Sequence, residues 1–126
     1  MIVGIGTDIV KVSRMAESLE KHGSRFAKRI LADSEYEQFQ EKMAPALFLA
    51  KRFAAKEAAV KALGTGFRDG ISMRHIFVEN DALGKPGLQF VEAAKTKIEE
   101  HQITYSHLSL ADEQEYAIAY VVLEKA

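Results

Sequence analysis

The sequence predicts one α+β domain in which a mainly antiparallel sheet packs on a single long helix. The chain has 126 residues, of which 48% are hydrophobic, and this size and composition suit one core. Apolar residues alternate with a period of two near both ends of the chain, which is typical of strands, whereas helical spacing dominates between them. The predicted order is β-α-α-α-β-β-α-β-β. It leaves residues 1–126 as a single domain, because no linker or repeat interrupts it.

The first strand is predicted over residues 2–10 and has two unlike faces. Gly4, Gly6 and Asp8 lie on one face, which is thereby stripped of bulk. The opposite face carries the larger side chains of Val3, Ile5, Thr7 and Ile9. Glycine inside a strand often marks the close approach of a ligand or of another backbone, and both explanations stay open here.

Helices are predicted to fill the next part of the chain. Three short ones are expected at residues 13–21, from Ser24 through Leu31, and from Ser34 to about residue 42. Ser34 and Glu37 have the spacing of a capping box. Pro45 suits a first helical position and Gly64 a C-terminal cap, so residues 45–63 form the strongest predicted helix.

The second half of the chain returns to strands. A strand is expected within residues 71–79, followed by a turn at 80–87 and a return toward the sheet at 88–90. Residues 91–101 have helical spacing. The last two strands, 105–110 and 115–123, alternate like an antiparallel pair around the turn at 111–114.

Composition excludes several kinds of chemistry. The chain has no cysteine, so thiol nucleophiles, redox pairs and thiolate zinc sites are excluded. Its four histidines lack zinc-ligand spacing, and no Walker-type phosphate loop or dinucleotide fingerprint is present. No apolar run approaches the ~20 residues that span a bilayer, and the first residues do not read as a signal peptide. A cytoplasmic protein without a membrane segment is therefore expected.

Charge is divided unevenly along the chain. The net charge is −1, but the first 74 residues carry +4 and the rest carry −5. Arg14, Lys21 and Arg25, together with the apolar Phe26, suit the docking of an acidic helix, because charges raise the association rate and apolar anchors supply affinity. Ordinary solvated charges explain the pattern equally well. Nucleic acid is not expected as a partner, since no aromatic stacking array or reading motif is present.

The predicted long helix places Glu57 and Lys61 on one face, among small and apolar residues. If this helix crosses the strand face that carries Asp8, then Asp8 and Glu57 converge beside Lys61. Two carboxylates and a lysine suit magnesium and substrate phosphates. Two simpler explanations stay open. Glu57 and Lys61 could form a surface ion pair, or the two acids could be buried partners of lysines.

Two segments of the chain resemble the signature of the 4'-phosphopantetheinyl transferases. Gly6-Thr7-Asp8 stands on the N-terminal strand, and Phe53-x-x-Lys56-Glu57-Ala58-x-x-Lys61 stands on the long helix. The chain length, residues 5–10, residues 52–58 and the Gly84-Lys85-Pro86 turn resemble the short, single-unit branch of holo-[acyl-carrier-protein] synthases. The similarity covers essentially the whole chain.

This resemblance implies the transferase fold, a reaction and a set of site residues. The reaction moves the phosphopantetheine arm of coenzyme A onto a serine of an apo acyl carrier protein, in fatty acid biosynthesis, and releases adenosine 3',5'-bisphosphate. Magnesium and a homotrimer with active sites between subunits are also implied. Asp8 and Glu57 match the metal-binding acids, Glu57 matches a residue that helps to activate the serine, and Lys61 matches a catalytic lysine near the coenzyme A phosphates. Further matches are Arg52, Gly64 and Pro86 at the coenzyme A site, and Arg14, Lys21, Arg25 and Phe26 at the carrier-docking surface.

The chain departs from the family pattern at one place. Many relatives carry Ser-x-Ser-His near the C-terminus, and its histidine approaches the coenzyme A phosphates. This chain has Ser109-Leu110-Ala111-Asp112 there, with His107 further back, so that role is not transferred.

Two rival functions stay open. A transferase of broader carrier specificity resembles two such units fused in one chain, and the length argues against it. A non-catalytic module that binds acidic protein or nucleotide is the rival from another class. Its binding would be indifferent to magnesium and to the loss of Asp8 or Glu57.

Overall fold

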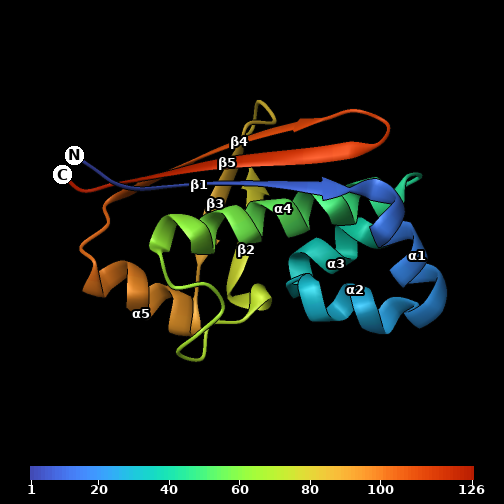
Figure 1. Cartoon of the computed structure of the whole chain (residues 1–126), viewed down its shortest axis with the longest axis horizontal. Helices are drawn as coiled ribbons and strands as arrows, with labels where there is room; N and C mark the ends of the chain where they lie inside the picture. Colours follow the sequence, from blue (N-terminus) through green and yellow to red (C-terminus); the bar gives the residue numbers. More distant parts are fainter.

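The computed structural model describes all residues 1–126 and confirms the predicted α+β fold and order of elements. Figure 1 shows α1, α2 and α3 gathered at one end of the molecule and α5 near the other, with both chain termini side by side. The helices are α1 (Val12–His22), α2 (Ser24–Ile30), α3 (Asp33–Gln40), α4 (Pro45–Leu63) and α5 (Glu92–Glu100), with a short 3₁₀ helix η1 (Met73–His75). The strands are β1 (Ile2–Lys11), β2 (Ile76–Asn80), β3 (Pro86–Phe90), β4 (Tyr105–Asp112) and β5 (Tyr116–Glu124).

The strands form two antiparallel sheets rather than one. The larger sheet has the order β1-β5-β4, and β2 pairs only with β3 in a separate hairpin. The last strand therefore lies between the first strand and β4. Its inward side chains Ala117, Ala119, Val121 and Leu123 are fully buried. No strand hydrogen bond joins the β2–β3 hairpin to the larger sheet, and the hairpin packs on the core through the buried side chains of Ile76, Val78 and Leu88.

Helix α4 lies across the inner face of β1 and β5 and forms the centre of the core (Figure 1). It begins with Pro45 and ends at Gly64, whose φ of +79° is left-handed, as the sequence predicted. Alanines on several sides of the helix have no exposed surface: they are Ala50, Ala54, Ala55, Ala58 and Ala59. Their small side chains let the sheet and the other helices approach the α4 backbone closely.

The two glycines of β1 are explained by this close approach. A Cβ on Gly6 would lie 2.0 Å from the carbonyl oxygen of Ala58, and one on Gly4 would lie 1.9 Å from that of Ala62. Of the two explanations that the sequence left open, contact with another backbone is the one observed. The glycines bring β1 against α4, and they thereby bring the Asp8 side of the strand to the long helix.

Helix α3 begins two residues earlier than a cap at Ser34 would place it. Ser34 and Glu37 do not form the predicted capping box, because the helix starts at Asp33. The carboxylate of Glu35 instead accepts the backbone N–H of Ala32, the residue before the helix, at 3.0 Å. Glu35 is completely buried, and its charge faces the middle of the molecule.

The outer face of the larger sheet is apolar and uncovered. Ile5, Ile9, Ile118 and Tyr120 are 40–60% exposed and share this face, because Ile9 lies directly opposite Ile118 in the strand pairing and Thr7 lies opposite Tyr120. Bulky side chains therefore point away from α4 on the side opposite the glycines. None of the helices combines the length and the apolar character needed to cross a membrane.

Candidate active site

The first part of the site is a pair of carboxylates, one on β1 and one on α4. Asp8 shares the inner face of β1 with the two glycines, and Lys61 reaches it from α4, where its ammonium lies 3.0 Å from Asp8 Oδ1 and 3.0 Å from the carbonyl oxygen of Thr7. The sequence left open a surface ion pair between Glu57 and Lys61. This explanation is wrong, because Lys61 forms its salt bridge with Asp8 and none with Glu57. The other simple explanation was that the two acids are buried partners of lysines. It is only partly met, because the Asp8 side chain is 16% exposed but that of its partner Lys61 is 53% exposed.

The charges of Asp8 and Lys61 act on Glu57. The pKa of Glu57 is raised, first by burial and then by the negative charge of Asp8, while the charge of Lys61 opposes the rise. Two carboxylates that repel each other beside a partly solvated helix face suit a hard divalent cation, which would relieve that repulsion. The residues present therefore fit magnesium. Its ligands would be the Asp8 and Glu57 oxygens, with the remaining positions left to water and substrate oxygens.

The second part is a groove of about 610 Å³ between the β2–β3 hairpin and the β4–β5 edge of the larger sheet. The hairpin contributes Asn80, Asp81, Lys85, Pro86 and Gln89, and the sheet contributes Ser106, His107, Ser109, Tyr120 and Val122. Of these, His107, Tyr120 and Val122 point to the outer, apolar face, because their strand-pairing partners lie on it. The groove therefore opens onto that face.

The groove and the carboxylate pair lie at opposite edges of the sheet. Asp8 is on the edge strand β1, and the groove borders the other edge strand β4, with β5 between them. None of Asp8, Glu57 or Lys61 lines the groove. Within one chain, the two parts are thus separate.

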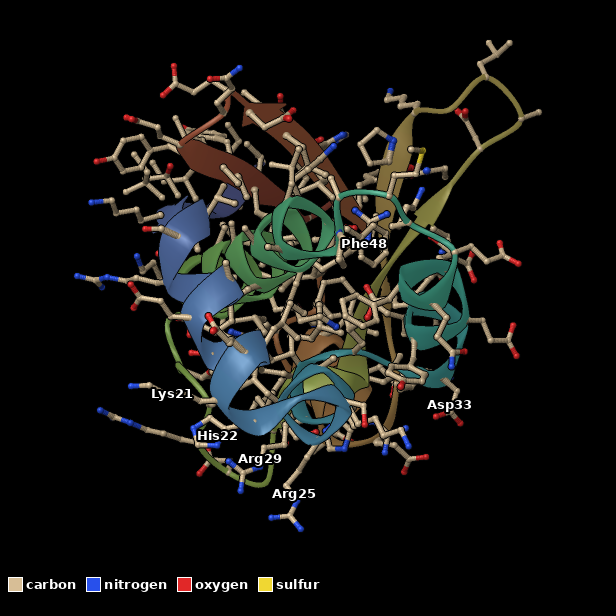
Figure 2. All side chains as sticks on the ribbon, turned by 90° about the vertical axis from the view of Figure 1, so that its right-hand side faces the viewer. Lys21, His22, Arg25, Arg29, Asp33 and Phe48 are labelled. Atoms are coloured by element: carbon tan, nitrogen blue, oxygen red, sulfur yellow. The ribbon has the colours of Figure 1, made fainter.

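A basic surface covers the end of the molecule formed by α1 and α2. Figure 2 shows Lys21, His22, Arg25 and Arg29 projecting from this end, whereas Asp33 lies apart from them. Arg14, Lys21 and Arg25 are exposed and make no salt bridge within 4.0 Å. Phe26 is half-buried against the core and remains partly accessible between the basic residues. The sequence grouped four of these residues, and the fold places them at one end of the molecule.

Glu35, Lys56 and Arg52 form a buried ionic cluster in the interior. This cluster was not identified from the sequence. Lys56 and Glu35 have no exposed side-chain surface, and their charged atoms lie 2.6 Å apart. Burial lowers the pKa of Lys56, and the carboxylate of Glu35 opposes this shift. The guanidinium of Arg52 lies 4.5 Å from the centre of the Phe48 ring, and its Nε lies 3.8 Å from Glu35 Oε2.

Comparisons with known proteins agree over the whole chain. The sequence model of the 4'-phosphopantetheinyl transferase superfamily matches residues 4–121. The chain belongs to this superfamily. A holo-[acyl-carrier-protein] synthase of Nitrosospira multiformis is 52% identical over 125 residues, which is 99% of this chain and 100% of that protein. Identity at this level over full length places the chain in the holo-[acyl-carrier-protein] synthase branch of these transferases.

Solved structures of this branch have the same fold. The crystal structure of holo-[acyl-carrier-protein] synthase from Neisseria meningitidis has a TM-score of 0.94 and 46% identity, and it covers 99% of this chain and 100% of its own. A synthase from Bacillus anthracis, solved in complex with CoA (3',5'-ADP), has a TM-score of 0.82 and 38% identity and covers 100% and 99% of the two chains. The transferase resemblance is thereby confirmed.

The residues that the transferase family suggested for coenzyme A lie in different surroundings. Pro86 lines the groove beside Lys85. Gly64 is exposed and ends α4. Arg52 is only 7% exposed, is stacked on Phe48, and its Nε has no hydrogen-bond partner.

Asp112 stands where many of the transferases have a histidine, and it lies apart from His107. Asp112 ends β4 and lies 3.8 Å from Lys51 of α4. His107 lines the groove, and its Nε2 lies 2.6 Å from Glu124 Oε1. The two residues therefore occupy different parts of the surface, and His107 is the histidine that borders the groove.

Sequence reasoning missed most of the groove. Gln89, Ser106 and Tyr120 become neighbours only through the packing of the hairpin against the sheet, and no local pattern marks them. Lys56 did carry a signal, since it is part of the family signature, whereas Glu35 carried none. Their pairing joins residues 21 positions apart in the sequence, and only the fold shows it.

Proposed function

We propose that the protein is a holo-[acyl-carrier-protein] synthase that uses coenzyme A and magnesium. It would transfer 4'-phosphopantetheine to a serine of an apo acyl carrier protein and thereby supply the carrier needed for fatty acid biosynthesis. The observation that carries this proposal is the convergence of Asp8, Glu57 and Lys61 at the crossing of β1 and α4, in a chain of this family. The groove near the sheet edge is of a size and polarity that suit the nucleotide end of coenzyme A.

In this reaction the serine oxygen bonds to the phosphorus that carries the pantetheine arm. The bond from that phosphorus to the bridging pyrophosphate oxygen breaks, and adenosine 3',5'-bisphosphate leaves with the electron pair. Glu57 accepts the serine proton, directly or through a water, and Lys61 stabilises the negative charge that develops on the phosphate oxygens. Magnesium held by Asp8 and Glu57 would supply charge neutralisation at the pyrophosphate. Positioning and electrostatics suffice for phosphoryl transfer, and no covalent enzyme intermediate is required.

The site is best completed by a second copy of the chain. The acids lie at the β1 edge of the sheet and the groove lies at the β4 edge, and the groove opens onto the exposed apolar face that joins the two edges. A copy seated on this face can place its own acids beside the groove of its neighbour. Because the two edges differ, such contacts are head-to-tail, and they form a closed ring when the rotation between neighbouring copies closes. A homotrimer with active sites between subunits satisfies this arrangement, and burial of the isoleucines would stabilise it.

The central experiment is intact-protein mass spectrometry of an apo acyl carrier protein after incubation with this protein and coenzyme A. We expect the carrier to gain the mass of phosphopantetheine with magnesium and to gain none with a chelator. Folded protein that binds coenzyme A but modifies none of several apo carriers, with or without magnesium, would instead support a non-catalytic binding module.

The basic surface of α1 and α2 should control the affinity for the carrier. We expect the double substitution Lys21→Glu and Arg25→Glu to raise the KM for the apo carrier by roughly tenfold or more, because like charges slow the encounter with an acidic partner. The KM for coenzyme A should stay unchanged. The measurement is steady-state kinetics at two salt concentrations, since added salt should narrow the difference between the variant and the parent protein.

A matched double substitution at the other end of the molecule serves as its control. Lys95→Glu and Lys125→Glu change the net charge equally but lie outside α1 and α2. An equal loss of carrier affinity in this control would assign the effect to net charge and not to the proposed docking surface.

The exposed sheet face should hold the oligomer together. We expect Ile5→Lys to convert the protein from a trimer to a monomer, because the lysine charge would have to be desolvated in the interface. Light scattering coupled to size-exclusion chromatography measures the mass directly. Met43→Lys is the matched control, since Met43 is fully exposed in the connection between α3 and α4, outside the larger sheet and the hairpin. A parent protein that is monomeric at micromolar concentration would contradict the proposed assembly.

A further inference from the structure

Lys56, like Glu35, is a charged residue with no exposed surface, and each of its three N–H donors has an acceptor. Its ammonium donates to Glu35 Oε1 at 2.6 Å, to the carbonyl oxygen of Met73 at 2.9 Å and to that of Ile76 at 2.5 Å. The last two acceptors belong to η1 and to the first residue of β2. One side chain of α4 therefore holds the segment that leads into the β2–β3 hairpin.

Glu35 holds the same hairpin from the other side. Its Oε2 accepts the backbone N–H of Val78 in β2 at 3.0 Å, while Oε1 accepts Lys56 and the N–H of Ala32. The carboxylate thus links α3, α4 and β2 through three hydrogen bonds in the interior. No strand hydrogen bond joins β2 and β3 to the larger sheet, so these polar contacts, together with the buried side chains of Ile76 and Val78, hold the base of the hairpin.

Stability alone does not account for such a cluster. The desolvation cost of a buried ion pair can exceed its Coulombic gain, and apolar replacements of similar volume are often as stable. The contacts of Lys56 are directional, however. They specify one orientation of the hairpin relative to α4, which apolar packing at this position would not specify.

The orientation of the hairpin matters because the hairpin is one wall of the groove. Asn80, Asp81, Lys85, Pro86 and Gln89 line it, and the segment that Lys56 and Glu35 hold lies directly before these residues in the chain. A tilt at Ile76 would displace the whole wall relative to Ser106 and Tyr120 of the sheet. The groove width would then change without any change in a residue that lines it.

We propose that Lys56 is a positioning residue whose buried ammonium, paired with Glu35, fixes the β2–β3 hairpin on α4 and so sets the shape of the groove that receives the nucleotide end of coenzyme A. This inference rests on the proposed function for its ligand. It predicts that loss of Lys56 weakens coenzyme A binding selectively, although Lys56 itself touches neither the groove nor the carrier surface.

The test compares Lys56→Met with the double variant Glu35→Gln and Lys56→Met. The single variant leaves the Glu35 charge buried without a partner and should lower the Tm, whereas the double variant removes both charges and should regain most of it. In the double variant we expect the KM for coenzyme A to stay raised by roughly tenfold over the parent value. The hairpin would be displaced, and the groove residues that it carries would no longer be positioned to contact the ligand. The KM for the carrier should stay within about twofold of the parent value, because Lys56 does not reach the basic surface. Amides of residues 77–89 should exchange hydrogen faster than in the parent protein.

Two further variants keep the test decisive. Lys56→Gln retains a side-chain N–H donor, and we expect it to restore part of the coenzyme A affinity. Val60→Ala is a stability control. Val60 is buried on α4 one turn from Lys56, and its side chain has no group that could hydrogen-bond to Glu35 or η1. A double variant with the parent KM for coenzyme A would overturn the proposal, as would an equal rise of KM in Val60→Ala.

Hydrogen exchange separates this inference from the proposed function. If the parent protein transfers no phosphopantetheine, the proposed function fails, and the exchange of residues 77–89 still reports whether Lys56 fixes the hairpin. Unchanged exchange in the single and double variants would overturn the positioning role, whatever the activity of the parent protein.

Discussion

Glu57→Gln is expected to lower the rate of phosphopantetheine transfer by about 10³-fold or more while the protein stays folded. The substitution removes one of two metal-binding carboxylates and the acceptor of the serine proton, and it keeps the shape of the side chain. The mass-spectrometric transfer assay under single-turnover conditions measures the effect. Near-normal activity with magnesium would remove Glu57 from the catalytic set.

The same variant should be more stable than the parent protein when no divalent cation is present. Burial and Asp8 raise the pKa of Glu57, so the folded protein favours its protonated form and loses stability as the pH rises through that pKa. The Tm of Glu57→Gln should therefore match the parent Tm at acidic pH and exceed it at neutral pH. Added magnesium should raise the parent Tm and leave the variant unchanged, because only the parent keeps both carboxylates.

A control for this prediction is Glu99→Gln on α5. Glu99 is exposed and forms no salt bridge, so its amide variant should keep the parent activity, Tm and magnesium response. A Glu57→Gln protein that is less stable than the parent at neutral pH would contradict the repulsion between Glu57 and Asp8.

Gly6→Ala is expected to destabilise the protein by about 3 kcal/mol or more, because the new methyl group meets backbone atoms that cannot move aside. The added Cβ would lie 2.0 Å from the carbonyl oxygen of Ala58 and 2.7 Å from the backbone nitrogen of Ala62. Relief requires β1 to separate from α4, which would also separate Asp8 from Lys61. For a domain of this size the Tm should fall by roughly 10 °C, measurable by differential scanning calorimetry.

Gly87→Ala is the matched stability control for this substitution. Gly87 is also a strand glycine, but a Cβ there would meet only the carbonyl oxygen of Glu79, at an ordinary contact distance of 3.8 Å. Its Tm should stay within a few degrees of the parent value. Equal losses in the two variants would show that glycine itself, and not the approach of β1 to α4, explains Gly6.

Local sequence patterns sufficed for the elements and for the acid pair. Pro45 and Gly64 marked the ends of α4 because backbone chemistry at a helix terminus depends on one or two residues. The alternation in residues 2–10 put Asp8 on the glycine face, and the family signature then supplied Glu57 and Lys61. The capping signal at Ser34 was wrong, because Ala32 precedes the helix and the buried carboxylate of Glu35 accepts its backbone N–H.

By itself, the sequence determined the order of elements, the long helix and the residues of the family signature, because each depends on neighbours within a few positions. Only the tertiary structure decided that β5 lies between β1 and β4, that Lys61 pairs with Asp8 and that Lys56 pairs with Glu35. It also decided that the apolar side of β1 faces outward and that the groove lies at the opposite edge from the acids. These features join residues far apart in the chain, and the burial and packing that select them arise only when the whole fold forms.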